Sequence, residues 1–226
     1  MLILLFNRQA RQKRQELKTW RLGILAVFIS CLFLLSCNSQ PAPQTQIITI
    51  NYSPFTEFQM NEVYACANDL SIILKVTHQN PEVYFQFGEP DVLLDFAYQI
   101  DEEEMIVVVN KQNDMQDVSV EEIQNLFATQ TMQVWVYPSA SEMQKVLNQF
   151  VMNGRGVSSF ANVAVSPKQV VEKIESESNA IGFIPKSLIT ENLKEIYSIG
   201  IFPVLALTES EPQGAVKSLI GCLQNP

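Results

Sequence analysis

The side chains that carry most enzyme chemistry are sparse in this sequence. The single histidine, His78, stands among polar residues and is interpreted as a loop residue. Ser139 and Ser141 lie close together, but neither has the Gly-x-Ser-x-Gly context of a hydrolase nucleophile. The sequence contains no Cys-x-x-Cys pair and no Cys/His cluster. We therefore predict no enzyme activity, no metal site and no cofactor.

Two acidic groups, at 102–104 and 121–122, contain neighbouring carboxylates. Runs of this kind are usually solvated surfaces, so we interpret neither as a catalytic pair. The stretch from Asp101 to Glu104 is expected to form an acidic turn between two strands. Glu122 has a separate predicted role, because Ser119 three residues before it completes a capping box that starts a helix.

The first 37 residues combine a basic segment with a short apolar segment. Six basic residues and one acidic residue precede Leu22–Ser36, which has fifteen residues and no charge. A basic segment, an apolar core and a small residue before the cut are typical of a secretory signal, here residues 1–36. Fifteen residues are fewer than the roughly 20 that span a bilayer. The alternative is an uncut membrane anchor in which Cys37 is an ordinary cysteine.

The sequence Leu34-Leu35-Ser36-Cys37 resembles the lipobox of bacterial lipoproteins. The resemblance implies that Cys37 is acylated and becomes the mature N-terminus, on the extracytoplasmic face of the cell membrane. Acyl chains hold a protein there because each buried CH₂ adds about 0.8 kcal/mol. Residues 37–46 are polar, uncharged and Pro-bearing, which is typical of an extended, flexible tether.

Two further cysteines remain once Cys31 is assigned to the signal and Cys37 to the lipid. They are Cys66 and Cys222. In an oxidising compartment we expect them to form a disulfide that joins the start of the folded region to its end. In the chain-entropy model, closing so long a loop contributes at most about 5 kcal/mol. The alternative is two buried free thiols.

The charge of the chain limits its partners. The net charge is −9, and the basic first 37 residues contribute +5, so the remainder carries −14. Such a surface argues against nucleic acid and anionic lipid as partners. It leaves open a small anion held by backbone N–H groups at helix N-termini.

Strands and helices alternate from residue 47 onward. The predicted strands are 47–52, 71–77, 83–87, 96–100, 105–109, 132–137, 181–184 and 201–207. The predicted helices are 57–70, 119–128, 142–152, one that starts at 166, and 213–223. This alternation indicates an α/β fold with largely parallel sheets.

Four segments carry a family resemblance. They are the strand 105–109 with Asn110, the helix 119–127, the serine-bearing loop and helix 139–150, and the sequence Asn-Ala-Ile-Gly-Phe-Ile-Pro at 179–185. Their order resembles the phosphate-binding-protein-like branch of the type 2 periplasmic solute-binding proteins, well over 83–190 and elsewhere only in the order of elements. The resemblance implies two lobes, 47–103 plus 197–226 and 104–196, joined by two crossings and closing on a ligand.

The same resemblance implies three ligand-holding loops. The residues at the corresponding positions are Ser53 and Thr56, Glu89 after Gly88, and Ser139, Ala140 and Ser141. Hydroxyls at a helix start suit an oxyanion, but they are also ordinary N-caps. Two departures count against phosphate: Glu142 stands where phosphate binders usually carry Arg, and the first loop contains the bulky Phe55.

We therefore expect an extracytoplasmic solute-binding lipoprotein. It would capture a small ligand, either an oxyanion such as phosphate or a small organic solute, by lobe closure, and pass it to an ABC permease. It is expected to be a monomer, to contact the lipid membrane through Cys37 and to bind no nucleic acid. The alternative is a degenerate binding-protein fold that acts as a sensor or surface interaction module without transport.

Overall fold

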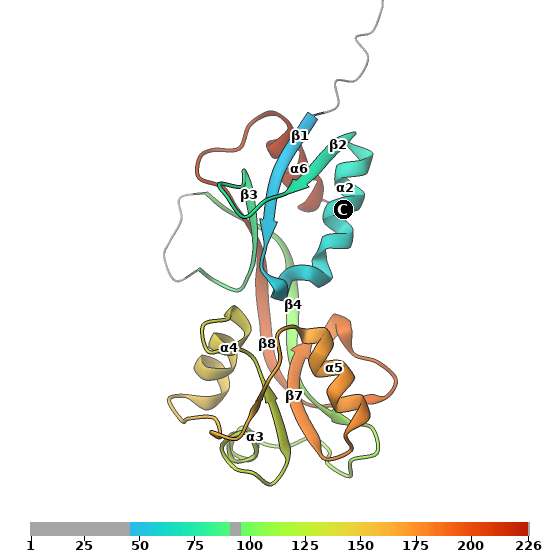
Figure 1. Ribbon diagram of the computed structural model, residues 1–226, viewed down its shortest axis with the longest axis vertical. Coiled ribbons are helices and arrows are strands. Elements are labelled where there is room, and N and C mark those ends of the chain that lie inside the picture. Colours follow the sequence, from blue (N-terminus) through green and yellow to red (C-terminus); the bar gives the residue numbers. More distant parts are fainter. Residues whose placement is uncertain (1–45, 91–95, 226) are drawn as a thin grey trace, which may run out of the picture. The chain divides into compact units, whose positions relative to one another are not determined.

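One eight-stranded mixed sheet organises the folded part of the protein (Figure 1). The computed structural model describes residues 46–90 and 96–225, which belong to one compact unit, Thr45–Pro226. The strand order is β2-β1-β3-β8-β4-β7-β5-β6. The strands are β1 Gln46–Tyr52, β2 Ile72–Val76, β3 Val83–Phe87, β4 Ala97–Asn110, β5 Gln133–Val136, β6 Asn162–Val163, β7 Ala180–Pro185 and β8 Leu193–Leu207.

The sheet is parallel toward its two ends and antiparallel in its centre. β1 pairs in parallel with β2 and β3, and β5 pairs in parallel with β6 and β7. β8 pairs antiparallel with β3 and β4, and β4 pairs antiparallel with β7. The predicted α/β class is confirmed, but the largely parallel sheets of the prediction are one mixed sheet, because the two longest strands are antiparallel neighbours.

The predicted acidic turn over Asp101–Glu104 is wrong, because these residues lie inside the continuous strand β4. The Glu103 side chain is buried and accepts a hydrogen bond from the backbone N–H of Ser187. Glu104 forms an ion pair with Lys186 at 2.8 Å and accepts a hydrogen bond from the Ser198 hydroxyl. These distant partners satisfy the carboxylates, so the strand continues through an acidic sequence.

Eight helical segments connect or cover the described strands. They are η1 Pro54–Gln59, α2 Met60–Asp69, α3 Val120–Ala128, α4 Glu142–Val146, η2 Leu147–Met152, α5 Pro167–Ser176, η3 Lys186–Leu188 and α6 Gly214–Leu223. The predicted capping box is confirmed, with Ser119 and Glu122 bonding each other's backbone N–H groups. The predicted helix 142–152 is α4 followed by the π-helical turn η2, and it ends at Asn153, whose φ is 45°.

Two hydrophobic cores lie along the sheet. In the first, which we call the lobe-one core, α2 and α6 pack side by side against β1–β3 (Figure 1). In the second, the lobe-two core, α3, α4 and α5 cover β4, β5 and β7. Gly182 permits close packing of α5 on β7, since an added Cβ would lie 2.7 Å from Val170 Cγ1. The glycine of the 179–185 motif therefore has a packing role.

The long strands β4 and β8 enter both cores, as does β3, whose Val83 and Phe85 lie in the lobe-one core and whose Phe87 lies in the lobe-two core. The predicted lobe limits, after Glu103 and before Tyr197, fall inside these strands. Side chains also cross the limits: Phe55, Phe87 and Phe202 come from segments assigned to lobe one but pack in the lobe-two core. The two crossings are thus paired strands of one sheet rather than separate linkers.

The predicted signal (1–36), most of the tether (37–46) and the acylation site Cys37 lie outside the described residues. The described chain starts in β1 at Gln46, which the prediction had placed in the tether. Among the described helices, none is both long and apolar enough to cross a membrane. Within residues 46–90 and 96–225, no three His, Cys, Asp or Glu side chains are grouped to hold a metal ion.

A disulfide joins Cys66 of α2 to Cys222 of α6, with a sequence separation of 156 residues. It connects two helices that already pack against each other in the lobe-one core. The bond therefore links the first and the last α-helix of the described residues.

We expect loss of this disulfide to lower the free energy of unfolding by about 2–4 kcal/mol, because the unfolded chain gains freedom when a long loop is opened. Urea unfolding of the full chain with and without dithiothreitol measures the effect. The Cys66→Ala/Cys222→Ala variant is the control, and its stability should not respond to dithiothreitol. Equal stability of the wild-type protein in both conditions would contradict the pairing.

Candidate functional site

The loop after β1 and the start of α4 meet between the two cores. The Ser53 hydroxyl donates a hydrogen bond to Glu142 Oε2 at 2.8 Å, and it accepts one from the Phe55 backbone N–H. Glu142 is the first residue of α4, and the N-cap Ser141 accepts a hydrogen bond from the Gln144 N–H. A carboxylate of the protein itself therefore contacts the loop that was expected to hold ligand oxygens.

Tyr84 of β3 lies close enough to Glu142 to register its charge. Burial is the main cause that raises the pKa of the Tyr84 phenol, and the Glu142 carboxylate raises it further. Because Tyr84 packs with β1 and β8 while Glu142 belongs to α4, this effect operates between the two lobes. The Tyr84 phenol is therefore a reporter of the position of Glu142.

An aromatic contact joins η1 to Tyr137, the residue that follows β5. Phe55 of η1 meets the Tyr137 ring edge-on, with ring centroids 5.2 Å apart. Tyr137 in turn packs on Phe183 of β7 at 4.8 Å and donates its hydroxyl hydrogen bond to the Phe183 carbonyl. Complete burial raises the pKa of the Tyr137 phenol well above its ordinary value, so this group stays neutral. The lobes are held together by apolar as well as polar contacts.

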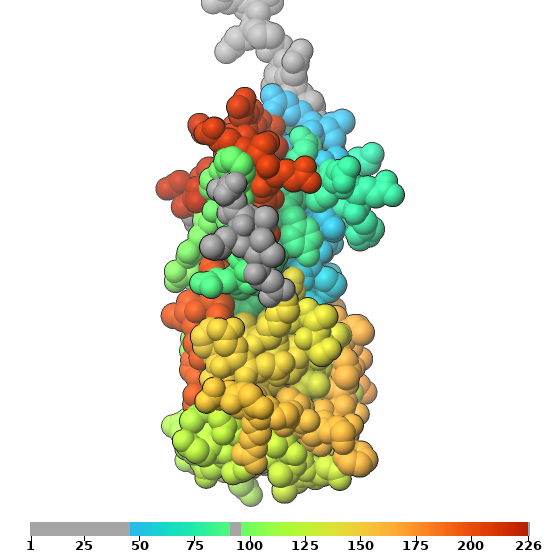
Figure 2. Space-filling view, turned by 90° about the vertical axis from the view of Figure 1, so that its left-hand side faces the viewer, coloured from blue at the N-terminus to red at the C-terminus, as the bar shows by residue number. Residues whose placement is uncertain are grey.

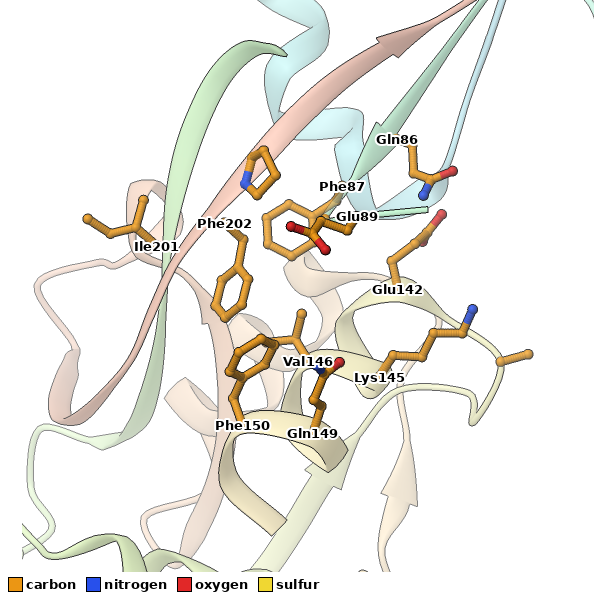
Figure 3. A pocket seen from close by; sticks show the side chains of 13 residues that line it. Gln86, Phe87, Glu89, Glu142, Lys145, Val146, Gln149, Phe150, Ile201 and Phe202 are labelled. Atoms are coloured by element: carbon orange, nitrogen blue, oxygen red, sulfur yellow. The ribbon is translucent and has the colours of Figure 1, made fainter. Parts of the chain in front are cut away.

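Beside these contacts lies a pocket of about 340 Å³ (Figure 3). It is lined by residues of β3 and the following turn, β8, and the α4–η2 segment: Gln86, Phe87, Gly88, Glu89, Ala140, Glu142, Lys145, Val146, Gln149, Phe150, Ile201, Phe202 and Pro203. Its volume lies within the range of small-molecule sites, about 300–1,000 Å³. Figure 2 shows the α4–η2 segment, in yellow, on the face of the second lobe that is turned toward the viewer.

Local geometry fixes two walls of this pocket. Gly88 has a φ of 73°, a value that favours glycine, and its N–H bonds the Pro203 carbonyl, so the chain turns sharply and presents Glu89. Three phenyl rings form another wall: Phe202 lies 6.0 Å from Phe87 and 4.9 Å from Phe150, between ring centroids. Phe150 is 51% exposed, so its ring is accessible from the pocket.

The structure places only some of the six predicted ligand residues at the pocket. Glu89 and Ala140 line the pocket, and Ser53 bonds the pocket residue Glu142. Thr56 is fully buried, and its hydroxyl donates to the Ser53 carbonyl.

The two remaining serines have other surroundings. Ser141 is buried as the N-cap of α4, and Ser139 lines a separate hollow that also contains Arg155. The structure therefore joins parts of the three predicted loops around one pocket but leaves Thr56, Ser139 and Ser141 outside it. Their contact with a ligand stays a prediction.

Sequence reasoning missed the aromatic wall. Phe87, Phe150 and Phe202 come from β3, η2 and β8, and no sequence spacing relates them. In the sequence only single residues point to this wall. Phe150 lies near the end of the predicted helix 142–152, and Glu142 replaces the Arg of the family pattern.

Comparison with solved structures places the fold among solute-binding proteins and regulatory domains. A protein assigned as a phosphate ABC transporter substrate-binding protein, with bound phosphate, from Clostridium perfringens has a TM-score of 0.68 at 12% identity, covering 79% of this chain and 93% of that chain. An ABC-type phosphate transport receptor from Vibrio cholerae has a TM-score of 0.58 at 13% identity, covering 80% and 94%. The reduced OxyR regulatory domain from Pseudomonas aeruginosa has a TM-score of 0.61 at 9% identity, covering 81% and 99%.

These similarities confirm the predicted type 2 periplasmic-binding-protein fold. No protein-family model and no curated protein matches the sequence. At identities of 9–13% the structural similarity concerns the fold alone, so the residues around the pocket have to be interpreted from their own chemistry.

We expect the Glu142→Gln substitution to lower the pKa of Tyr84, because it removes one of the two causes that raise it. The pKa should remain above its ordinary value, since burial persists. NMR titration of the full chain with ¹³C-labelled tyrosine measures the change. Glu57→Gln is the matched control, because Glu57 raises the pKa of Tyr52 and should leave Tyr84 unaffected. An unchanged Tyr84 in Glu142→Gln would mean that the lobes lie apart in solution.

Proposed function

We propose that this protein is an extracytoplasmic solute-binding lipoprotein that holds a small organic solute in the pocket between β3, β8 and α4. The observation that carries the proposal is the pocket itself, which both lobes line at the point where the predicted ligand loops meet. Its aromatic wall and its polar side chains suit an organic molecule with apolar and polar parts. Delivery to an ABC permease is the role that this fold supports best.

Phosphate is a poor match for this pocket. A phosphate ion would lie near the Glu89 and Glu142 carboxylates, and like charges at close range repel. Ser53, whose hydroxyl could otherwise bond an anion, already donates to Glu142. The phosphate-binding proteins with the same fold therefore support capture of a solute, while the residues here favour another ligand.

Membrane attachment rests on the sequence. The basic segment, the uncharged run Leu22–Ser36 and the following Cys37 support cleavage and acylation at Cys37. The polar residues after Cys37 would leave the folded unit tethered at the membrane surface.

A sensor without transport is the second candidate function. The Ser53–Glu142 hydrogen bond and the Phe55–Tyr137 contact hold the lobes together by residues of the protein itself. The OxyR regulatory domain shares this fold, which supports a role in which the bound solute is read by another protein.

Capture predicts that a small organic solute stabilises the full chain in dodecyl maltoside. A thermal-shift screen of amino acids, amines, small sugars, phosphate and sulfate tests it, since a ligand at 100 times its Kd adds about 2.7 kcal/mol. Phe150→Ala should remove the shift. Phe160→Ala is the matched control, because Phe160 is 74% exposed and does not line the pocket. A shift that survives Phe150→Ala would place the ligand elsewhere, and a flat screen would favour an interaction module.

Acylation predicts that the full chain sediments with membranes in a bacterial host and that Cys37→Ala releases it into the soluble extracytoplasmic fraction or leaves the signal uncut. Incorporation of labelled palmitate into the wild-type protein, but not into Cys37→Ala, is the measurement. Cys222→Ala is the control, since this cysteine is in the disulfide and should not affect labelling. Labelling that persists in Cys37→Ala would contradict the proposal.

A further inference from the structure

Three charged side chains line the pocket: two carboxylates, Glu89 and Glu142, and one ammonium, Lys145. Among the described residues, the Glu89 carboxylate makes no hydrogen bond and no ion pair. Glu89 follows Phe87 by two residues at the end of β3 and lines the same pocket as Phe150 and Phe202, whereas Figure 3 shows Lys145 extending away from the rings. The end of the pocket that contains the rings is therefore negatively charged.

The aromatic wall has the same electrostatic preference. The face of a phenyl ring is the negative part of its quadrupole and attracts a cation within about 6 Å of the ring centroid. Phe202 is in contact with both Phe87 and Phe150. Phe87 is fully buried and Phe202 nearly so, whereas Phe150 is half exposed, so Phe150 supplies most of the ring surface that a ligand in the pocket can reach. Rings and a carboxylate at one end of a pocket are complementary to a positively charged group with an apolar surface.

We propose that the pocket binds a small organic cation whose alkylammonium group lies between Glu89 and the exposed ring of Phe150, which packs on Phe202. The inference rests on the proposed solute-binding function and names its ligand class. One positive charge on the ligand would balance the net charge of the three charged side chains in the lining. The net charge of −9 of the whole chain favours the approach of a cation over that of an anion.

A matched pair of probes separates charge from shape. Choline and 3,3-dimethyl-1-butanol have nearly the same shape, but only choline is charged. Isothermal titration of the full chain in dodecyl maltoside should show choline and tetramethylammonium binding, with the uncharged alcohol at least about tenfold weaker. Choline binding should weaken as the salt concentration rises, and phosphate should not compete.

Variants assign the effect to the pocket. Glu89→Gln should weaken choline binding by about fivefold or more and leave the uncharged alcohol unchanged. Phe150→Leu should also weaken choline binding, because it replaces a ring by an alkyl group of similar size. Glu172→Gln is the control, since Glu172 is an exposed carboxylate of α5 outside the pocket.

The outcomes distinguish this inference from the proposed function. Three outcomes overturn the inference but leave solute binding in place. The first is an equal affinity for choline and the uncharged alcohol, and the second is an unchanged choline affinity in Glu89→Gln. The third is binding of a neutral or anionic solute in the pocket while choline, tetramethylammonium and putrescine all fail to bind. If no solute of any charge binds, both proposals fail.

Discussion

The antiparallel pairing of β4 with β8 is the interaction on which the rest of the structure depends. It extends from Ala97 opposite Leu207 to Asn110 opposite Leu193, and so one hydrogen-bonded ribbon passes through both hydrophobic cores. Irregularities in the register occur along β4, and they increase the local twist without ending the pairing. Because the crossings are themselves a ribbon, the loop after β3 and the start of α4 are fixed near each other, which creates the pocket.

Elements defined by local interactions were predictable from the sequence. The strand Val83–Phe87 was predicted with its observed limits, and the Ser119 capping box starts a helix because its two hydrogen bonds lie within four residues. The continuity of β4 could not be predicted in this way. Its acidic centre is stabilised by Lys186 and Ser187, more than 80 residues away, which no local pattern reveals. β6 was missed because two residues carry no periodicity.

In the candidate site, too, local features were predictable and long-range contacts were not. The loops around the pocket were located from sequence, because strand ends and helix starts are local features. The contacts of their side chains could not be located in this way. Ser141 caps its own helix, and Ser53 forms a hydrogen bond with Glu142. Only the tertiary fold brings Phe87, Phe150 and Phe202 together in the pocket wall, so their spacing along the chain does not predict it.

The contacts between the lobes separate closure from ligand binding. Ser53 meets Glu142 and Phe55 meets Tyr137 outside the aromatic wall, so a solute beside Phe150 need not replace either contact. A ligand shifts an equilibrium only by its difference in affinity between the two states. Where the protein's own contacts already favour the closed state, little of the binding free energy is spent on closure, and the apparent Kd approaches the intrinsic one.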